Sequence, residues 1–176
     1  MFEKYILREK YIEKVKPFIN KNVIKVLTGQ RRVGKSYIMY QLIDTIKASV
    51  ENANIIYINC ELEEFRGIKT SSELYKYIQE HLVENHDLNY LFIDEVQEID
   101  SFQDTLRSLL VEKKCDIYCT GSNADLLSGE LATTLSGRSI EIEISSLSYK
   151  EFLEFHKLEN NQDSIVKYLT LGGLPF

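Results

Sequence analysis

The segment Gly29-Gln-Arg-Arg-Val-Gly-Lys-Ser36 decides the fold, because it follows an apolar run at 23–27 and precedes a helical pattern at 35–50. Its spacing is G-x-x-x-x-G-K-[ST]. The two glycines allow a tight loop whose N–H groups point inward and bind an anion. The helix that follows adds the positive end of its dipole. The sequence therefore predicts a phosphate-binding loop between a strand and a helix.

The residues of this loop have separate expected roles. We expect Lys35 to reach the outer phosphates and the Ser36 hydroxyl to bind Mg²⁺. Two interpretations of Arg31 and Arg32 stay open: contacts with phosphate or a neighbouring subunit, or two solvated arginines on a loop. The residues expected to bind the nucleotide are Gly29, Gln30, Arg31, Arg32, Val33, Gly34, Lys35, Ser36 and Tyr37.

A second motif, Asp94-Glu95, follows the apolar run 90–93 and resembles a Walker B strand. Asp94 is expected to hold Mg²⁺, and Glu95 to orient and deprotonate an attacking water. An acidic pair after a strand is common, but both motifs lie at carboxyl ends of strands, where ligands of parallel sheets bind. Asp-Glu is typical of ATP hydrolysis, and the Asn-Lys-x-Asp segment of a GTPase is absent. We therefore expect an ATPase that uses ATP and Mg²⁺.

Strand-like and helix-like patterns alternate along the whole chain. Such alternation predicts an α/β fold, a parallel sheet covered by helices on both faces. We expect strands at 23–27, 54–58, 90–93, 116–119 and 139–144. Helices are expected from about residue 12 to Pro17, over 35–50, from Thr70, from Ser101, over 124–135, from Ser148 and over 163–171. Thr70-x-x-Glu73 and Ser148-x-x-Glu151 are capping boxes, Ser101 is expected to cap its helix, and the alternation at 139–144 favours a sheet edge.

The composition limits the classes of function. The chain has 176 residues and a net charge of −6. This negative charge argues against strong non-specific binding of nucleic acid. It contains no apolar run of the ~20 residues that a membrane span needs, so we expect a cytoplasmic protein without a membrane partner. Cys60, Cys115 and Cys119 lack C-x-x-C spacing, and we expect buried thiols rather than a metal site.

An ordered set of motifs carries a family resemblance. It comprises 27–36, Phe92-Ile-Asp-Glu-Val-Gln97, Thr120-Gly-Ser-Asn123, Leu135-Ser-Gly-Arg138, Leu147-Ser-Tyr-Lys-Glu-Phe152 and Gly172-Gly-Leu-Pro175. This set resembles a family of prokaryotic AAA+ superfamily ATPases, over nearly the whole chain. The resemblance implies a P-loop NTPase with a five-stranded parallel sheet in the order 5-1-4-3-2.

The resemblance also implies roles for single residues. Asn123, or Ser122, would act as a sensor of the γ-phosphate, although a helix N-cap is the alternative. Arg138 would be an arginine finger on a neighbouring subunit's nucleotide, and an ordinary exposed arginine is the alternative. Asn59 would hold Glu95 in an inactive pose. Apart from the resemblance, Ile6, Arg8 and nearby residues are candidate walls of the adenine pocket, because this segment precedes strand one.

Members of this family are about twice as long and carry a further C-terminal domain. We therefore expect residues 1–176 to be a single ATP-binding domain and a fragment of a longer protein. The favoured function is a switch or remodelling ATPase, with a homo-oligomer and an unidentified protein partner. A nucleic-acid motor is the alternative, and a small-molecule kinase is disfavoured by Asp94-Glu95. The support for a nucleic-acid motor is a set of basic residues near the opening helix and in the loop: Lys10, Lys14, Lys16, Lys21, Arg31 and Arg32.

Overall fold

Five parallel strands form one sheet in the computed structural model, which describes residues 5–85, 88–121, 135 and 137–175. The order is β2-β3-β4-β1-β5, with all neighbours parallel. Read from the other edge, this is the expected order 5-1-4-3-2, so the fold prediction is confirmed. The strands are β1 Ile24–Thr28, β2 Asn54–Asn59, β3 Asn89–Asp94, β4 Asp116–Thr120 and β5 Ser139–Glu143.

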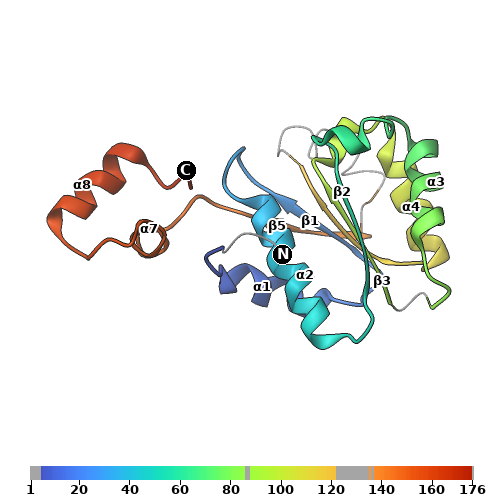
Figure 1. Cartoon of the computed structure of the whole chain (residues 1–176), viewed down its shortest axis with the longest axis horizontal. Helices are drawn as coiled ribbons and strands as arrows, with labels where there is room; N and C mark the ends of the chain where they lie inside the picture. The colour runs from blue at the N-terminus through green and yellow to red at the C-terminus, as the bar shows by residue number, and fades with distance from the viewer. Residues whose placement is uncertain (1–4, 86–87, 122–134, 136, 176) are drawn as a thin grey trace.

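Helices cover both faces of the sheet (Figure 1). One face packs against α1 (Glu9–Val15) and α2 (Lys35–Ser49), and the other against α3 (Ser71–His81) and α4 (Phe102–Glu112). Alternate residues of β3 divide between the two cores: Phe92 joins the α1–α2 side, while Leu91 and Ile93 join the α3–α4 side. The middle residues of the central strand β3 are therefore apolar on both faces, as a sheet covered on both sides requires.

The starts of the helices test the sequence signals directly. Thr70 and Ser148 both form complete capping boxes, as predicted, with Glu73 and Glu151. The expectation for Ser101 is wrong: α4 begins at Phe102, but Ser101 has φ +54° and its side chain makes no capping hydrogen bond. A capping residue needs extended backbone angles to turn its oxygen onto the first turn of the helix, and the left-handed conformation prevents this.

The edge position of β5 is confirmed. β5 pairs only with β1, and Ile142 is buried while its neighbours Glu141 and Glu143 are exposed. At the other end of the chain, α1 stops at Val15 and continues as a single 3₁₀ turn, Lys16–Phe18, that contains the expected Pro17 break.

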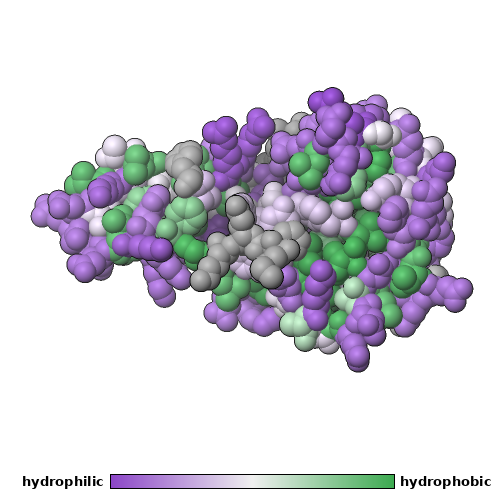
Figure 2. All heavy atoms as spheres, in the orientation of Figure 1, coloured by the Kyte–Doolittle hydropathy of each residue, from purple (hydrophilic) through white to green (hydrophobic). Residues whose placement is uncertain are grey.

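Two C-terminal helices, α7 (Tyr149–His156) and α8 (Gln162–Leu171), stand apart from the sheet (Figure 1). Figure 2 shows apolar side chains among hydrophilic ones on this end of the molecule. Leu169 of α8 is 77% exposed, and Phe152, Val166 and Leu171 line a shallow cavity of about 420 Å³ between the two helices. No described helix is both long and apolar enough to cross a bilayer.

A buried ion pair fixes the amino ends of β1 and β4. Lys25 is fully buried, and its ammonium group contacts the Asp116 carboxylate and donates to the Lys21 carbonyl oxygen at 3.0 Å. The carboxylate also accepts from the Tyr118 hydroxyl and the Asn20 N–H. Burial lowers the pKa of Lys25, although the nearby Asp116 charge works in the opposite direction. The pair is stable only while both charges are present.

We predict that Asp116→Asn lowers the free energy of unfolding by about 3 kcal/mol, because it leaves a buried ammonium without its counter-charge. The double variant Lys25→Met/Asp116→Asn should recover most of this loss, since asparagine still accepts from Asn20 and Tyr118. Urea unfolding followed by circular dichroism measures both values. Equal stability of Asp116→Asn and the parent would contradict the assignment.

Candidate functional site

The loop between β1 and α2 depends on three left-handed backbone positions. Gly29, Arg32 and Gly34 have φ values of +142°, +68° and +94°. A Cβ at Gly29 would collide with the carbonyl oxygen of Ile144, whereas a Cβ at Gly34 would meet nothing within 4 Å. Glycine is therefore needed at position 29 for both space and angle, and at position 34 for angle alone. Val33 is buried and anchors the loop to the core.

The Lys35 ammonium group is folded onto this loop. It is 4% exposed and donates to the Gly29 carbonyl oxygen at 3.1 Å and the Gln30 carbonyl oxygen at 3.4 Å. Its third neighbour is the Glu95 carboxylate, with 3.7 Å between Nζ and Oε1. The predicted phosphate loop and the predicted water-activating residue therefore meet, although β1 and β3 are separated by β4.

Thr120, the last residue of β4, forms hydrogen bonds with both Asp94 and Glu95. Its hydroxyl donates to Asp94 Oδ1 and accepts from the Glu95 N–H at 2.9 Å. The second Asp94 oxygen accepts from the Tyr57 hydroxyl at 3.2 Å, and the Asp94 residue is 1% exposed. Burial, followed by the Asp94 charge, raises the pKa of Tyr57, so this phenol stays a neutral donor. Both Asp94 oxygens are thus held in place by neighbouring strands.

Glu95 has a strained backbone and a bound side chain. Its φ of +56° is uncommon for a residue with a Cβ. Its Oε2 accepts from Gln97 Nε2 at 2.7 Å, and its Oε1 faces Lys35. The carboxylate therefore lies between a lysine of the loop and an amide of the 3₁₀ turn Val96–Glu98.

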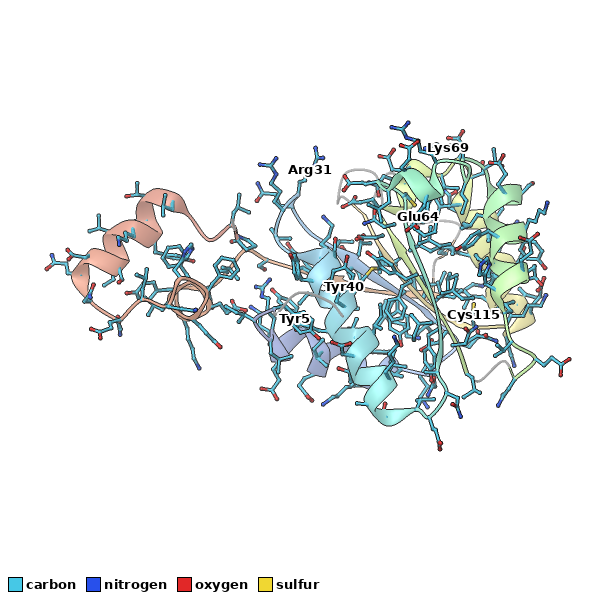
Figure 3. The ribbon with its side chains drawn as sticks, in the orientation of Figure 1. Tyr5, Arg31, Tyr40, Glu64, Lys69 and Cys115 are labelled. Atoms are coloured by element: carbon cyan, nitrogen blue, oxygen red, sulfur yellow. The ribbon has the colours of Figure 1, made fainter. Side chains whose placement is uncertain are left out.

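Several predicted residues lie at the border of this site or away from it. Arg31 is 82% exposed, points out from the loop and lies 3.6 Å from Glu61 (Figure 3). Arg32 and Tyr37 are also exposed. These positions agree with solvated arginines, while contacts with a nucleotide or a neighbouring subunit stay a prediction. Ser122 and Asn123 lie outside the described residues.

Arg138 is at the opposite end of the sheet from the loop. Its carbonyl oxygen accepts from the N–H of Ile24, the first residue of β1, whereas the phosphate loop follows Thr28, the last one. Its side chain is exposed. Within one chain, Arg138 therefore does not reach the site at Lys35, and a finger role requires a second subunit.

Asn59 contacts a residue other than the predicted one. Its side-chain oxygen accepts from the Glu61 N–H at 2.9 Å, and Gln97 instead provides the hydrogen bond to Glu95. Gln97 lies in the quoted Phe92–Gln97 motif, so its position was available from the sequence. Its contact was not, because a 3₁₀ turn after a strand has no reliable sequence signal.

Arg8 was expected to be a wall of the adenine pocket, but its guanidinium group is 6% exposed and bound by protein groups. It donates to the carbonyl oxygens of Val33, Ser145 and Ser146, at 3.2, 3.0 and 3.3 Å. It also forms an ion pair with Glu151 of α7 at 2.8 Å. Arg8 therefore ties the phosphate loop to the segment that leads into α7. A single arginine near the start of the chain gives no sequence signal that it will link these two segments.

The three cysteines are free thiols, as expected. Burial raises the pKa of Cys60, Cys115 and Cys119 to about 12 in each case. Thiols with such pKa values stay protonated and unreactive near neutral pH. Within the described ranges, no group of three or more His, Cys, Asp or Glu side chains could hold a metal ion.

The fold and the loop define a P-loop nucleoside-triphosphate domain, and residues 21–153 match the family described as "AAA domain". The chain belongs to this family. Two curated relatives are both uncharacterised proteins. One, from Haemophilus influenzae, is 38% identical over 99% of this chain and 45% of its own length. The other, from Methanocaldococcus jannaschii, is 36% identical over 99% of this chain and 42% of its own length. The chain thus spans less than half of either relative.

Solved structures confirm the fold. The Saccharomyces cerevisiae Hsp104–ADP complex superposes with a TM-score of 0.67 at 17% identity, over 89% of this chain and 24% of that one. Cdc6p from Pyrobaculum aerophilum gives 0.60 at 14% identity, over 89% and 50%. Caenorhabditis elegans PCH-2 gives 0.57 at 18% identity, over 94% and 44%. At these identities the likeness establishes the architecture.

The Arg8–Glu151 pair makes stability depend on pH. Burial raises the pKa of Glu151, but hydrogen bonds from Arg8 and from the Ser148 hydroxyl and N–H outweigh it and lower the pKa from 4.5 to about 2. A lowered pKa stabilises the fold above the unfolded value, and this stabilisation is lost as the pH falls toward the folded value.

We predict that Glu151→Gln lowers the free energy of unfolding by about 1–2 kcal/mol near neutral pH, since it weakens a charge-assisted hydrogen bond that is partly exposed. The gap between parent and variant should shrink as the pH drops from about 4.5 toward 2. Urea unfolding across this range measures it. A gap that does not change with pH would contradict the role of the carboxylate.

Proposed function

We propose that this domain binds ATP with Mg²⁺ and hydrolyses it to ADP and phosphate, as a molecular switch or remodelling ATPase. The observation that carries the proposal is the meeting of Lys35 and Glu95, at 3.7 Å, across the carboxyl ends of strands that are not neighbours. Family membership and the ADP-bound Hsp104 neighbour support nucleotide binding. The two motifs together provide groups for binding phosphate and for activating water.

The loop offers the chemistry that a triphosphate needs. The Lys35 ammonium group is buried, and its neighbours are two backbone carbonyl oxygens and one carboxylate at the limit of an ion pair. A phosphate oxygen would supply a full negative charge and replace the weaker carbonyl contacts. The α2 N-terminus, which starts at Lys35 itself, adds its dipole.

The oxygen ligands of the site fit Mg²⁺. Asp94 is a carboxylate whose two oxygens are fixed by Thr120 and Tyr57, and Ser36 is the first hydroxyl of α2. Mg²⁺ prefers oxygen ligands, keeps several waters and binds through one or two protein groups plus phosphates. Asp94 and Ser36 would hold the ion, which would neutralise charge on the phosphates.

Glu95 would act on the attacking water. The water oxygen attacks the γ-phosphorus, the proton passes to a Glu95 oxygen, and the bond to the β-phosphate oxygen breaks with its electron pair left on ADP. Phosphate binding removes Lys35 from Glu95 in this scheme. The carboxylate becomes available as a base when a nucleotide is bound.

We predict that Lys35→Ala weakens ATP·Mg²⁺ binding by at least about 30-fold, roughly 2 kcal/mol, because a buried phosphate contact is lost. Isothermal calorimetry measures the affinity. Lys47→Ala is the matched control, since Lys47 lies in the last turn of the same helix and is exposed. Equal affinity of parent and Lys35→Ala would remove the basis of the proposal.

Glu95→Gln should retain ATP binding and lower phosphate release by about 100-fold or more, as expected when a general base is removed. The amide keeps the size of the side chain but does not take up a proton. A phosphate-release assay on the same samples as the calorimetry tests this. Unchanged release would refute Glu95 as the base.

Assembly belongs to the same proposal. Arg138 is exposed and far from the site of its own chain, so it would act as a finger only on the nucleotide of another subunit. The relatives are more than twice as long as the matched segment, and the output of the switch, together with its protein partner, would involve that further region.

The structure gives the nucleic-acid alternative little support. Lys10 and Lys14 lie over the Tyr11 ring, and Lys16 forms an ion pair with Glu13. We predict no measurable binding of duplex DNA in a filter assay, even at low salt, because the net charge is −6. Tight binding that falls steeply with salt would instead favour a nucleic-acid ATPase.

A further inference from the structure

Gln97 makes one hydrogen bond to a described residue, and this bond goes to the proposed base. Its Nε2 donates to Glu95 Oε2 at 2.7 Å. Its other polar atom, Oε1, is buried and accepts no hydrogen bond from any described residue. The amide must keep this orientation, because the opposite one would place a carbonyl oxygen against a carboxylate.

This arrangement is unfavourable for stability. A buried polar atom without a partner loses its contacts with water and gains nothing in return. Glu95 adds a second cost, because its backbone is left-handed at φ +56°. Both costs fall at the proposed base and at the residue that binds it, and costs of this kind tend to cluster at functional sites.

The two Glu95 oxygens have different neighbours. Oε1 lies 3.7 Å from Lys35 Nζ, and Oε2 is bound by Gln97. When a phosphate binds Lys35, only the Oε1 atom of Glu95 loses its contact, because Lys35 is the neighbour of that oxygen. The hydrogen bond from Gln97 persists, because it comes from the turn that follows Glu95 and not from the loop. One oxygen is then free for water while the other fixes the orientation of the carboxylate.

We propose that Gln97 is the positioning residue for Glu95 in hydrolysis and holds the carboxylate in its productive orientation, whereas the resemblance implied that Asn59 holds it in an inactive pose. The inference rests on the proposed function. Gln97 does not touch the nucleotide in this scheme and acts only through Glu95. Its loss should therefore change the rate of the chemical step and leave ATP affinity unchanged.

The test is Gln97→Met, which has a similar shape and lacks the donor. Phosphate release at saturating ATP should fall by about 10- to 100-fold, since a misplaced base loses this much. The ATP dissociation constant should stay within about twofold. The melting temperature should change little, because removal of the unpaired buried oxygen offsets the loss of the hydrogen bond to Glu95.

Gln79→Met is the matched control. Gln79 also has one bonded polar atom, Oε1 with Lys114 at 2.8 Å, and one buried polar atom without a partner, Nε2. It lies in α3, away from the loop. This substitution should leave phosphate release unchanged. A similar fall in both variants would mean that the effect is structural and would overturn the proposal.

A double-mutant cycle separates positioning from a structural role. In a Glu95→Gln background, Gln97→Met should cause no further loss of phosphate release, whereas independent effects would multiply. Unchanged release in Gln97→Met, with loss in Glu95→Gln, would overturn this inference and keep the proposed function. Unchanged release in Glu95→Gln, or no release by the parent, would overturn both.

Discussion

The site depends on a buried lysine, a buried carboxylate and a half-buried carboxylate at the carboxyl ends of strands separated by β4. Charges in such a place are tolerated only when each has partners. Lys35 has two loop carbonyl oxygens and Glu95, and Asp94 has the hydroxyls of Thr120 and Tyr57. Thr120 belongs to the intervening strand, so the sheet order itself brings its hydroxyl to both residues: it donates to the Asp94 carboxylate and accepts from the Glu95 N–H.

The same order explains how the loop and the acidic pair can respond to each other. Lys35 is the first residue of α2, and Glu95 follows β3, yet within the described part of the chain the only ion pair of either residue is with the other. An anion that binds at the loop competes with Glu95 for the lysine. Occupation of the loop and the state of the acidic residue would therefore be coupled, as the proposed switch requires.

A second coupling runs from the loop to the C-terminal helices. Arg8 bonds the Val33 carbonyl oxygen in the loop, the carbonyl oxygens of Ser145 and Ser146, and the Glu151 carboxylate at the start of α7. Glu151 is also the partner of Ser148 in the capping box of α7. A shift of the loop would thus reach α7 through one buried guanidinium group. The pair α7–α8 stands apart from the sheet, where such a shift has room to act.

The sequence by itself determined the described strands and helices, their parallel arrangement and the positions of Lys35, Asp94 and Glu95, because hydrophobic period and glycine spacing are local properties of the chain; the helix expected over 124–135 lies outside the described residues, apart from Leu135. The family resemblance added the strand order. Local patterns misjudged Ser101, whose left-handed backbone is set by its surroundings. Only the tertiary structure placed Arg138 at the far end of the sheet, gave Glu95 the partner Gln97 instead of Asn59, and made Arg8 a bridge. Each of these depends on contacts between elements distant in sequence or on an irregular turn, which residue spacing does not encode.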